Sequence, residues 1–346
     1  NDGDLDLVVG NREGANQANR IWINQGHVSC FIDEICDNGI DDDSDGLIDC
    51  DDSECAPGEF VDSGQVLGNS NSSGVALGDV DGDGDLDAWI ANYASPGQSN
   101  ALWINDGAGS FTESGQSIGY SPSLEIELGD IDGDGDLDAF VANWEGQPNR
   151  IFTNDGKGIF SDSLQSIGNA SSFEVALEDL DGDGDLDAWI ANGGPNQVWL
   201  NDGIGIFTNS NQSLGSTVSH GVALGDFDGD GDIDAWVANI NQPNRTWEND
   251  GLGNFTDSGQ ALGNSYSNDV ALGDLDNDGD LDAWVSNYNQ PNHVWLNDGN
   301  GVFSDSAQEL GNSLGYEVAL GDFDNDNDLD ALVANEGGQP NKIWLN

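Results

Sequence analysis

A single acidic phrase recurs along the chain, and its spacing constrains the fold more than any other feature. With small changes it reads Gly-Asp-x-Asp-Gly-Asp-Gly-Asp-Leu-Asp-Ala-Trp. The first Asp of each copy is Asp79, Asp130, Asp179, Asp226, Asp274 and Asp322. These starts are separated by 51, 49, 47, 48 and 48 residues, and residues 1–6 match the second half of a further copy. Repetition at a near-constant period indicates an array of one structural unit.

Each unit has room for four short strands and no helix. In the repeat that spans 75–119, apolar runs at 75–78, 88–92 and 101–105 are followed by a fourth run that opens at 110–112. Gly, Asn, Asp and Pro residues separate the runs, as expected for turns between antiparallel strands. A period of about 40–50 residues with four strands is typical of a β-propeller. The sequence therefore predicts an all-β fold, a seven-bladed β-propeller of four-stranded antiparallel blades.

The repeats also predict the domain organisation. They cover residues 1–26 and 59–346, with the first and last repeats incomplete, and residues 27–58 interrupt the first repeat. The first repeat is expected to lack its innermost strand and the last its outermost one. We expect residues outside this sequence, or a neighbouring copy, to complete the ring.

The charge of the chain restricts its partners. Six basic residues face 66 acidic ones, for a net charge of -60. Such an excess opposes compaction unless cations neutralise it, and it excludes nucleic acid and anionic membranes as partners. No apolar run approaches the roughly 20 residues that span a bilayer, so no membrane insertion is expected.

The acidic phrase has the ligand pattern of a calcium loop. In the first complete copy, carboxylates stand at loop positions 1, 3, 5, 7 and 9, from Asp79 to Asp87, and Gly84 at position 6 permits a sharp turn. Oxygen ligands at alternating positions suit Ca²⁺, whereas Mg²⁺ keeps more water. Positions 1, 3, 5 and 9 can converge on one ion, and position 7 is expected to offer its backbone carbonyl. The competing interpretation is a set of acidic turns without an ion, which would leave strong repulsion in every loop.

The expected calcium ligands follow from this pattern, for about six to eight ions. They are Asp2, Asp4 and Asp6; Asp79, Asp81, Asp83, Asp85 and Asp87; Asp130, Asp132, Asp134, Asp136 and Asp138; Asp179, Asp181, Asp183, Asp185 and Asp187; Asp226, Asp228, Asp230, Asp232 and Asp234; Asp274, Asp276, Asp278, Asp280 and Asp282; Asp322, Asp324, Asp326, Asp328 and Asp330; and, in the interrupting segment, Asp41, Asp43, Asp45, Leu47 and Asp49.

With these loops between short strands, the chain resembles the FG-GAP/VCBS repeats of integrin α-subunit propellers and of many bacterial surface proteins. The resemblance covers nearly everything outside residues 27–58. It implies that each calcium loop joins the first and second strands of a blade. It also implies that the opposite face, which carries the second-to-third and fourth-to-first connections, binds partners.

The interrupting segment contains all four cysteines, Cys30, Cys36, Cys50 and Cys55. It resembles the small Cys- and Asp-rich calcium modules of bacterial secreted proteins. We expect disulfides, with the nested pairs Cys36–Cys50 and Cys30–Cys55 favoured among three possible pairings. A zinc site is the alternative, although no C-x-x-C pair is present. Disulfides imply an oxidising compartment, and hence a secreted, extracellular or cell-surface protein.

The aromatic residues recur at fixed places in the repeat, which favours packing between blades over ligand binding. Only Trp144 lacks counterparts and is a candidate surface contact. The recurring positions hold Trp89, Phe140, Trp189, Trp236 and Trp284 in one series, and Trp22, Trp103, Phe152, Trp199, Trp247, Trp295 and Trp344 in another.

The residues that could perform catalysis are few, and we expect no enzyme. Tyr120, His220, Tyr266 and Tyr316 fall in fourth-to-first connections and could share one face, as a polysaccharide lyase would require. The nearby basic residues Arg150, Arg245 and Lys342 recur as a strand-start position, as do Arg20 and His293, which favours a structural role. The predicted function is an extracellular calcium-binding structural or adhesion protein, a rigid scaffold on a cell surface or in a filament or matrix. Expected partners are calcium, other copies of the chain, or extracellular glycans and proteins. The alternatives are a lectin-like propeller and, after it, a polysaccharide lyase.

Overall fold

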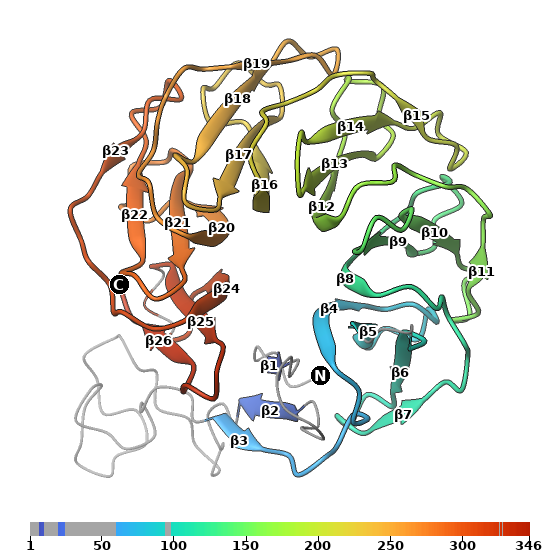
Figure 1. Cartoon of the computed structure of the whole chain (residues 1–346). Helices are drawn as coiled ribbons and strands as arrows, with labels where there is room; N and C mark the ends of the chain where they lie inside the picture. Colours follow the sequence, from blue (N-terminus) through green and yellow to red (C-terminus); the bar gives the residue numbers. More distant parts are fainter. Residues whose placement is uncertain (1–6, 10–19, 25–59, 94–97, 325, 327) are drawn as a thin grey trace, which may run out of the picture.

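The computed structural model describes residues 7–9, 20–24, 60–93, 98–324, 326 and 328–346. All regular secondary structure in these ranges is β-strand, arranged as antiparallel sheets in a ring around a central axis (Figure 1). No described residue lies in a helix long and apolar enough to cross a bilayer.

Each blade runs outward from the axis in chain order. The innermost strands are β4 (Ser72–Gly78), β8 (Ser123–Gly129), β12 (Ser172–Glu178), β16 (Ser219–Gly225), β20 (Ser267–Gly273) and β24 (Gly315–Gly321). The second strands are β5 (Asp87–Asn92), β9 (Asp138–Asn143), β13 (Asp187–Asn192), β17 (Asp234–Asn239), β21 (Asp282–Asn287) and β25 (Asp330–Asn335). The third strands are β6 (Ala101–Asn105), β10 (Arg150–Thr153), β14 (Gln197–Leu200), β18 (Arg245–Asn249), β22 (His293–Leu296) and β26 (Lys342–Trp344). The outermost strands are β7 (Phe111–Glu113), β11 (Ser161–Asp162), β15 (Thr208–Asn209), β19 (Phe255–Asp257) and β23 (Ser304–Asp305).

The predicted count of seven blades is corrected by this arrangement. Six blades contain the inner pair of strands that flanks an acidic loop, five of them with four strands and the last with three. The remaining sheet, β1 (Leu7–Val9), β2 (Arg20–Asn24) and β3 (Phe60–Asp62), has three strands and no inner pair of this kind among the described residues. It lies between the first and last blades in Figure 1. The period of the repeat was interpreted correctly, but counting a partial phrase as an equivalent blade was wrong.

The core lies between neighbouring blades, as the recurring aromatic positions predicted. Trp89, Phe140, Trp189 and Trp236 on the second strands are completely buried. Trp89, for example, packs edge-on against Phe160 of the next blade, with ring centroids 5.1 Å apart. Burial of one such ring stabilises the fold by about 2–3 kcal/mol, so every blade depends on its neighbour. Trp144 is half-buried, and its ring centroid lies 5.2 Å from that of Tyr93.

A glutamine near the end of each repeat joins successive blades. The Nε2 of Gln116 donates to the Gly158 carbonyl of the next blade (2.6 Å), and its Oε1 accepts from the Phe160 N–H (3.0 Å). The same pair of bonds is made by Gln65, Gln165, Gln212 and Gln260. These contacts satisfy partly buried backbone groups at the start of the outermost strands. They tie the outer edges of the blades together.

Candidate metal centre

Each acidic loop connects the first and second strands of its blade, as the family resemblance implied. In the loop between β4 and β5, both oxygens of Asp79 accept backbone N–H bonds, from Gly82 (2.8 Å), Asp83 (3.1 Å) and Gly84 (2.9 Å). The turn requires a left-handed backbone at position 6, where Gly84 has φ 94°. The position-1 carboxylate therefore shapes the loop around itself.

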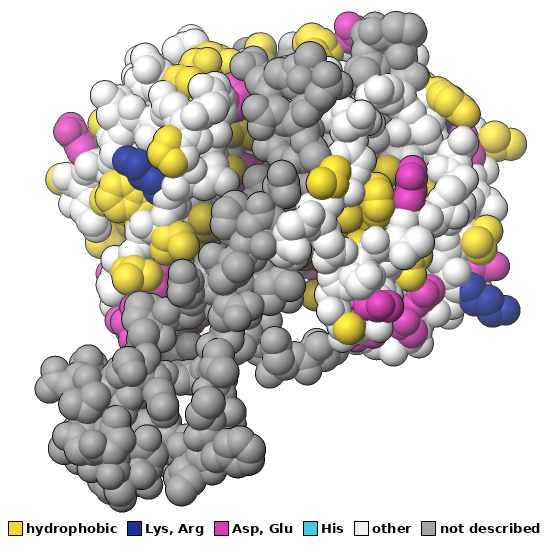
Figure 2. Space-filling model, turned by 90° about the horizontal axis from the view of Figure 1, so that it is seen from below, with side chains coloured by type: hydrophobic (Ala, Val, Ile, Leu, Met, Phe, Trp, Pro, Cys, Tyr) yellow, Lys and Arg dark blue, Asp and Glu magenta, His cyan; other side chains and the backbone are white. Residues whose placement is uncertain are grey.

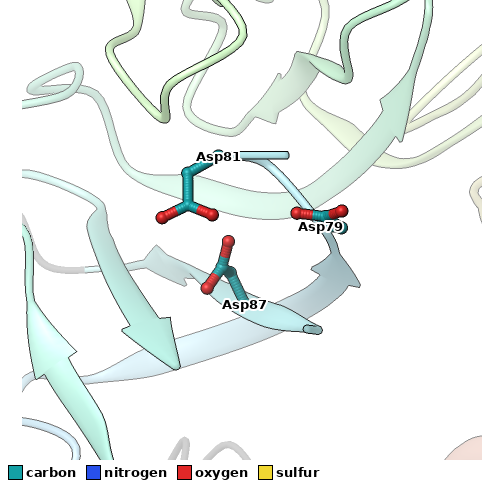
Figure 3. A group of neighbouring side chains, drawn as sticks. All are labelled: Asp79, Asp81 and Asp87. Carbon is teal, nitrogen blue, oxygen red and sulfur yellow. The ribbon is translucent and has the colours of Figure 1, made fainter. Parts of the chain in front are cut away.

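The side chains at positions 1, 3 and 9 of this loop point toward one another (Figure 3). Asp79, Asp81 and Asp87 each place a carboxylate oxygen within 4.8 Å of the others. Asp87 at position 9 begins β5 and is only 1% exposed. Its two oxygens accept from Asn105 N (2.8 Å) and Val80 N (3.1 Å), which fixes its orientation.

The same convergence recurs in other loops. Groups of three carboxylates that could hold one metal ion are Asp79, Asp81 and Asp87; Asp130, Asp132 and Asp134; Asp179, Asp181 and Asp187; Asp226, Asp228 and Asp230; and Asp274, Asp276 and Asp282. Positions 1 and 3 take part in all five groups, position 9 in three and position 5 in two. Position 7 takes part in none of these five. Instead, a Cβ added to Gly107 would lie 2.1 Å from Asp85 Oδ2, so Asp85 at position 7 packs on the turn after β6.

The loops contain carboxylate oxygens that fit a cation. At position 3, Oδ1 of Asp81, Asp132 and Asp181 is buried and has no hydrogen-bond partner. At position 9, Oδ2 of Asp138 and of Asp234 is likewise buried and has no hydrogen-bond partner. A buried, unpaired carboxylate oxygen is costly, and a divalent ion with oxygen ligands removes that cost. The donor set consists of oxygen atoms alone, which suits Ca²⁺ or Mg²⁺ and not a soft metal.

Burial perturbs these carboxylates strongly. Loss of solvent around Asp187 and Asp234 raises the pKa of each to about 7, and it raises the pKa of Asp138 to about 6. Neighbouring loop carboxylates add to the shift, while backbone N–H donors oppose it. Without a cation, these three position-9 carboxyls are therefore poorly suited to carry their charge at neutral pH.

In five of the six described loops, an asparagine of the next blade donates a hydrogen bond to the loop backbone. Asn154, at the end of β10, donates through Nδ2 to the Val80 carbonyl at position 2 of the preceding loop (2.8 Å). It also donates to Leu137 of its own blade (3.1 Å). Equivalent bonds to the preceding loop are made by Asn201, Asn249, Asn297 and Asn346. The sequence analysis missed this contact, although the Asn of the recurring Asn-Asp-Gly turn was visible as its signal.

Other predicted residues lie elsewhere. Arg150, Arg245, His293 and Lys342 each begin a third strand, as predicted from their repeat position. The four aromatic or His residues predicted in the fourth-to-first connections lie at the starts of first strands or shortly before them. His220 and Tyr316 are the second residues of β16 and β24, Tyr266 precedes β20, and Tyr120 is an exposed loop residue. Outside the described residues lie the ligands predicted at Asp2, Asp4, Asp6, Asp41, Asp43, Asp45, Leu47 and Asp49, and the four cysteines.

The comparison with family models agrees with this geometry. The model of the FG-GAP-like repeat matches residues 79–141, 130–190, 179–237, 226–285 and 274–333. These matches span most of the chain and each contains an acidic loop. The chain therefore belongs to the FG-GAP-like repeat family. No curated protein matches its sequence.

Solved structures share the fold at low sequence identity. A functionally unknown protein from Desulfotomaculum acetoxidans DSM 771 has a TM-score of 0.64 at 12% identity, covering 99% of this chain and 92% of its own. A protein from Lactobacillus plantarum has a TM-score of 0.61 at 14% identity, with coverages of 82% and 83%. An Agrocybe aegerita lectin that recognises non-reducing terminal N-acetylglucosamine has a TM-score of 0.51 at 17% identity, with coverages of 87% and 78%. At these identities the likeness concerns the fold alone.

Removing one predicted ligand should weaken one site and leave the others intact. Asp183 is the exposed position-5 residue of the loop between β12 and β13, and its Oδ1 accepts from Asp185 N (3.0 Å). Asp183→Ala should weaken calcium binding at this loop about tenfold or more, because ligand charge sets affinity. Calorimetric titration should then show one weakened site. Glu248→Gln, which removes an exposed charge from β18, is the matched control. Simultaneous loss of all sites would contradict independent loops.

Changing the asparagine behind a loop should weaken a blade contact and a metal site together. Asn249→Asp replaces the donor that bonds the Leu180 carbonyl (2.9 Å) by a second acceptor, beside the loop that begins at Asp179. The lost bond and the unpaired buried carbonyl should lower the free energy of unfolding by about 2–3 kcal/mol. Denaturant unfolding measures this loss, and a calcium titration should locate the weakened site in the preceding blade. Asn169→Asp, in an exposed connection, should change neither quantity.

Proposed function

We propose that the chain is an extracellular calcium-binding structural or adhesion protein, a rigid propeller on a cell surface or in a filament or matrix. The observation that carries the proposal is the repeated geometry of the loops. Carboxylates converge in five loops, several of them with buried oxygens that lack partners, and the loops from the one at Asp79 to the one at Asp274 are each bonded to the following blade. An ion bound in one loop would therefore stiffen a contact between two blades.

Calcium is the proposed ion, and an extracellular site follows from it. Three carboxylates converge in each of five loops, and with the remaining oxygen groups of the loop they suit Ca²⁺ better than Mg²⁺, which keeps several waters. Extracellular calcium modules commonly bind in the range of about 10⁻⁴–10⁻³ M, where calcium is continuously abundant. The acidic surface also agrees with an extracellular location. Figure 2 shows acidic side chains on several parts of one face and few basic ones. The proposed disulfides of residues 27–58 agree with it.

A non-catalytic role is supported by the contacts of the basic residues. Nη1 of Arg150 donates to the Gln165 carbonyl (2.9 Å), and Nη1 of Arg245 donates to the Gln260 carbonyl (2.7 Å). These bonds hold the ends of strands. Both arginines are therefore engaged in structure, whereas a lyase would need a cation beside a Tyr or His base.

Carbohydrate binding is the alternative that needs a direct test. The similar Agrocybe aegerita lectin recognises N-acetylglucosamine. In the present chain, however, Trp89, Trp189 and Trp236 are completely buried, so their faces are closed to a sugar ring. Any glycan site would have to use other groups.

A glycan array probed in millimolar calcium, beside electron microscopy of the same preparation, tests the proposal. The scaffold role predicts no glycan above background and calcium-dependent particles or filaments of constant shape. Specific capture of one glycan would replace it with the lectin function. Release of unsaturated products from a uronate polysaccharide would replace it with lyase activity.

A further inference from the structure

The innermost strands bring a second group of carboxylates to the axis of the propeller, distant from the loops. Each innermost strand has a register shift between its first and third residues, which turns the third residue toward the axis. Four of these third residues are acidic, and we call them the axial carboxylates. They are Glu125 on β8, Glu174 on β12, Asp269 on β20 and Glu317 on β24.

The other two blades have glycine at this position and leave room for the charges. A Cβ added to Gly74 would lie 2.6 Å from both carboxylate oxygens of Glu125. A Cβ added to Gly221 would lie 2.7 Å from the Asp269 Cα and 3.1 Å from its Oδ1. Any larger side chain at Gly74 or Gly221 would displace an acidic neighbour. Small residues in two blades and acids in four thus make one asymmetric group.

The axial carboxylates line a cavity of about 340 Å³ together with His220 and Tyr316. Their hydrogen bonds run partly between blades. Oε2 of Glu174 accepts from Val222 N of β16 (3.3 Å), and Oδ2 of Asp269 accepts from Val318 N of β24 (2.8 Å). Oε1 of Glu125 accepts only from its neighbour Ile126 N (3.0 Å). These bonds tie the axial carboxylates to the contacts that hold the inner strands together.

No Lys or Arg on the described inner strands balances these charges. Beside the axial carboxylates, the titratable groups there are Glu127 on β8, Glu178 on β12, His220 on β16 and Tyr316 on β24, while β4 has none. His220 lies against Phe173 (ring centroids 4.1 Å apart), and its Nδ1 is 3.1 Å from Asn268 Oδ1. Arg150, Lys157, Arg245 and Lys342 belong to outer strands and turns.

We propose that the axial carboxylates form a pH-sensitive clasp between blades, closed when they are protonated and loosened when they ionise. Protonated carboxyls can share the narrow cavity without repulsion. When the protons leave to solvent, four negative charges face one another with no cation on the surrounding inner strands. This repulsion weakens the contacts between β8, β12, β16, β20 and β24, because those strands contain the carboxylates and their backbone donors.

The pKa shifts that burial imposes on the axial carboxylates agree with this geometry. Desolvation, reinforced by the charge of Glu317, raises the pKa of Asp269 to about 7. Desolvation and the neighbouring acids raise the pKa values of Glu125 and Glu174 well above the ordinary value, and desolvation raises that of Glu317. Glu317 is the most exposed of the four to solvent, so it contributes least to the pH dependence of stability. A folded-state pKa above the unfolded one means stability that is complete below about pH 4 and decreases as the pH rises toward about 7.

Thermal unfolding of the calcium-saturated chain between pH 5 and pH 8 tests the clasp, since saturation keeps the loop carboxylates ionised throughout. The melting temperature should fall by about 5 °C or more over this range. In a variant with Glu125→Gln, Glu174→Gln, Asp269→Asn and Glu317→Gln, the melting temperature should fall by less than half as much over the same range. The control replaces the exposed Glu113, Glu145, Glu248 and Glu309 by Gln and should follow the parent chain.

Two results would overturn the proposal. One is an equal fall in the axial variant and the parent. The other is a parent more stable than the axial variant at pH 8, which would mean that the axial carboxylates hold a cation. If the fourfold variant does not fold, infrared absorption of protonated carboxyl groups in the parent replaces it. That absorption should decrease between about pH 6 and pH 8, and Asp269→Asn alone should reduce its amplitude. Absence of protonated carboxyls at pH 6 would refute the clasp.

Discussion

Chelation of calcium with excess EGTA should lower the melting temperature of this chain by on the order of 20 °C, because several sites lose their ions at once. Each emptied loop regains a cluster of repelling carboxylates, and most of the loops also regain buried, unpaired oxygens, such as Oδ1 of Asp81 and of Asp181. The loss spreads to blade contacts, because Asn154 and its counterparts bond the loops to the next blade. Differential scanning calorimetry measures the shift.

Metal add-back is the control for the chelation experiment. Adding back excess Ca²⁺ should restore the original transition, whereas the same concentration of Mg²⁺ should restore only part of it. A melting curve that does not change in excess chelator would mean that the loops contribute nothing to stability as metal sites.

Trp236→Ala should lower the free energy of unfolding by about 3–5 kcal/mol, the second large effect that we expect. Trp236 on β17 is completely buried between two blades and meets Phe303 of the next one edge-on, with ring centroids 6.5 Å apart. Truncation leaves a cavity that rigid sheets cannot close. Denaturant unfolding in saturating calcium measures the loss.

Trp236→Phe is the matched control, because another blade already has phenylalanine at the equivalent position. Phe140 occupies the equivalent position on β9, completely buried, with its ring 5.6 Å from that of Phe207. The indole N–H of Trp236 has no hydrogen-bond partner, so its removal breaks no bond. Trp236→Phe should therefore cost about 1 kcal/mol. An equal loss in both variants would show that ring volume is not what stabilises the blade interface.

The architecture could be predicted from the sequence because it repeats. Runs at 75–78, 88–92 and 101–105 became β4, β5 and β6 with boundaries shifted by at most three residues, and the acidic phrase marks the turn between the first two strands. The Trp positions identified the interface between blades for the same reason. A signal that recurs in every blade is easily separated from chance.

The features that the sequence analysis did not predict are departures from the repeat. The axial carboxylates are single residues, Glu125 or Asp269 for example, at a strand position where other blades have glycine. Their proximity arises only when the ring closes and the register shift turns them inward. The count of seven blades failed for a related reason, since a phrase cut short by the chain start is weak information about a complete blade.

Native mass spectrometry of the chain in calcium tests the central claim most directly. The account predicts a series of adducts that ends at no fewer than six calcium ions, one for each loop from the one that begins at Asp79 to the one that begins at Asp322. The series should lose one ion in Asp183→Ala at limiting calcium. A chain that keeps the mass of the bare polypeptide, 36.4 kDa, in excess calcium would contradict the account.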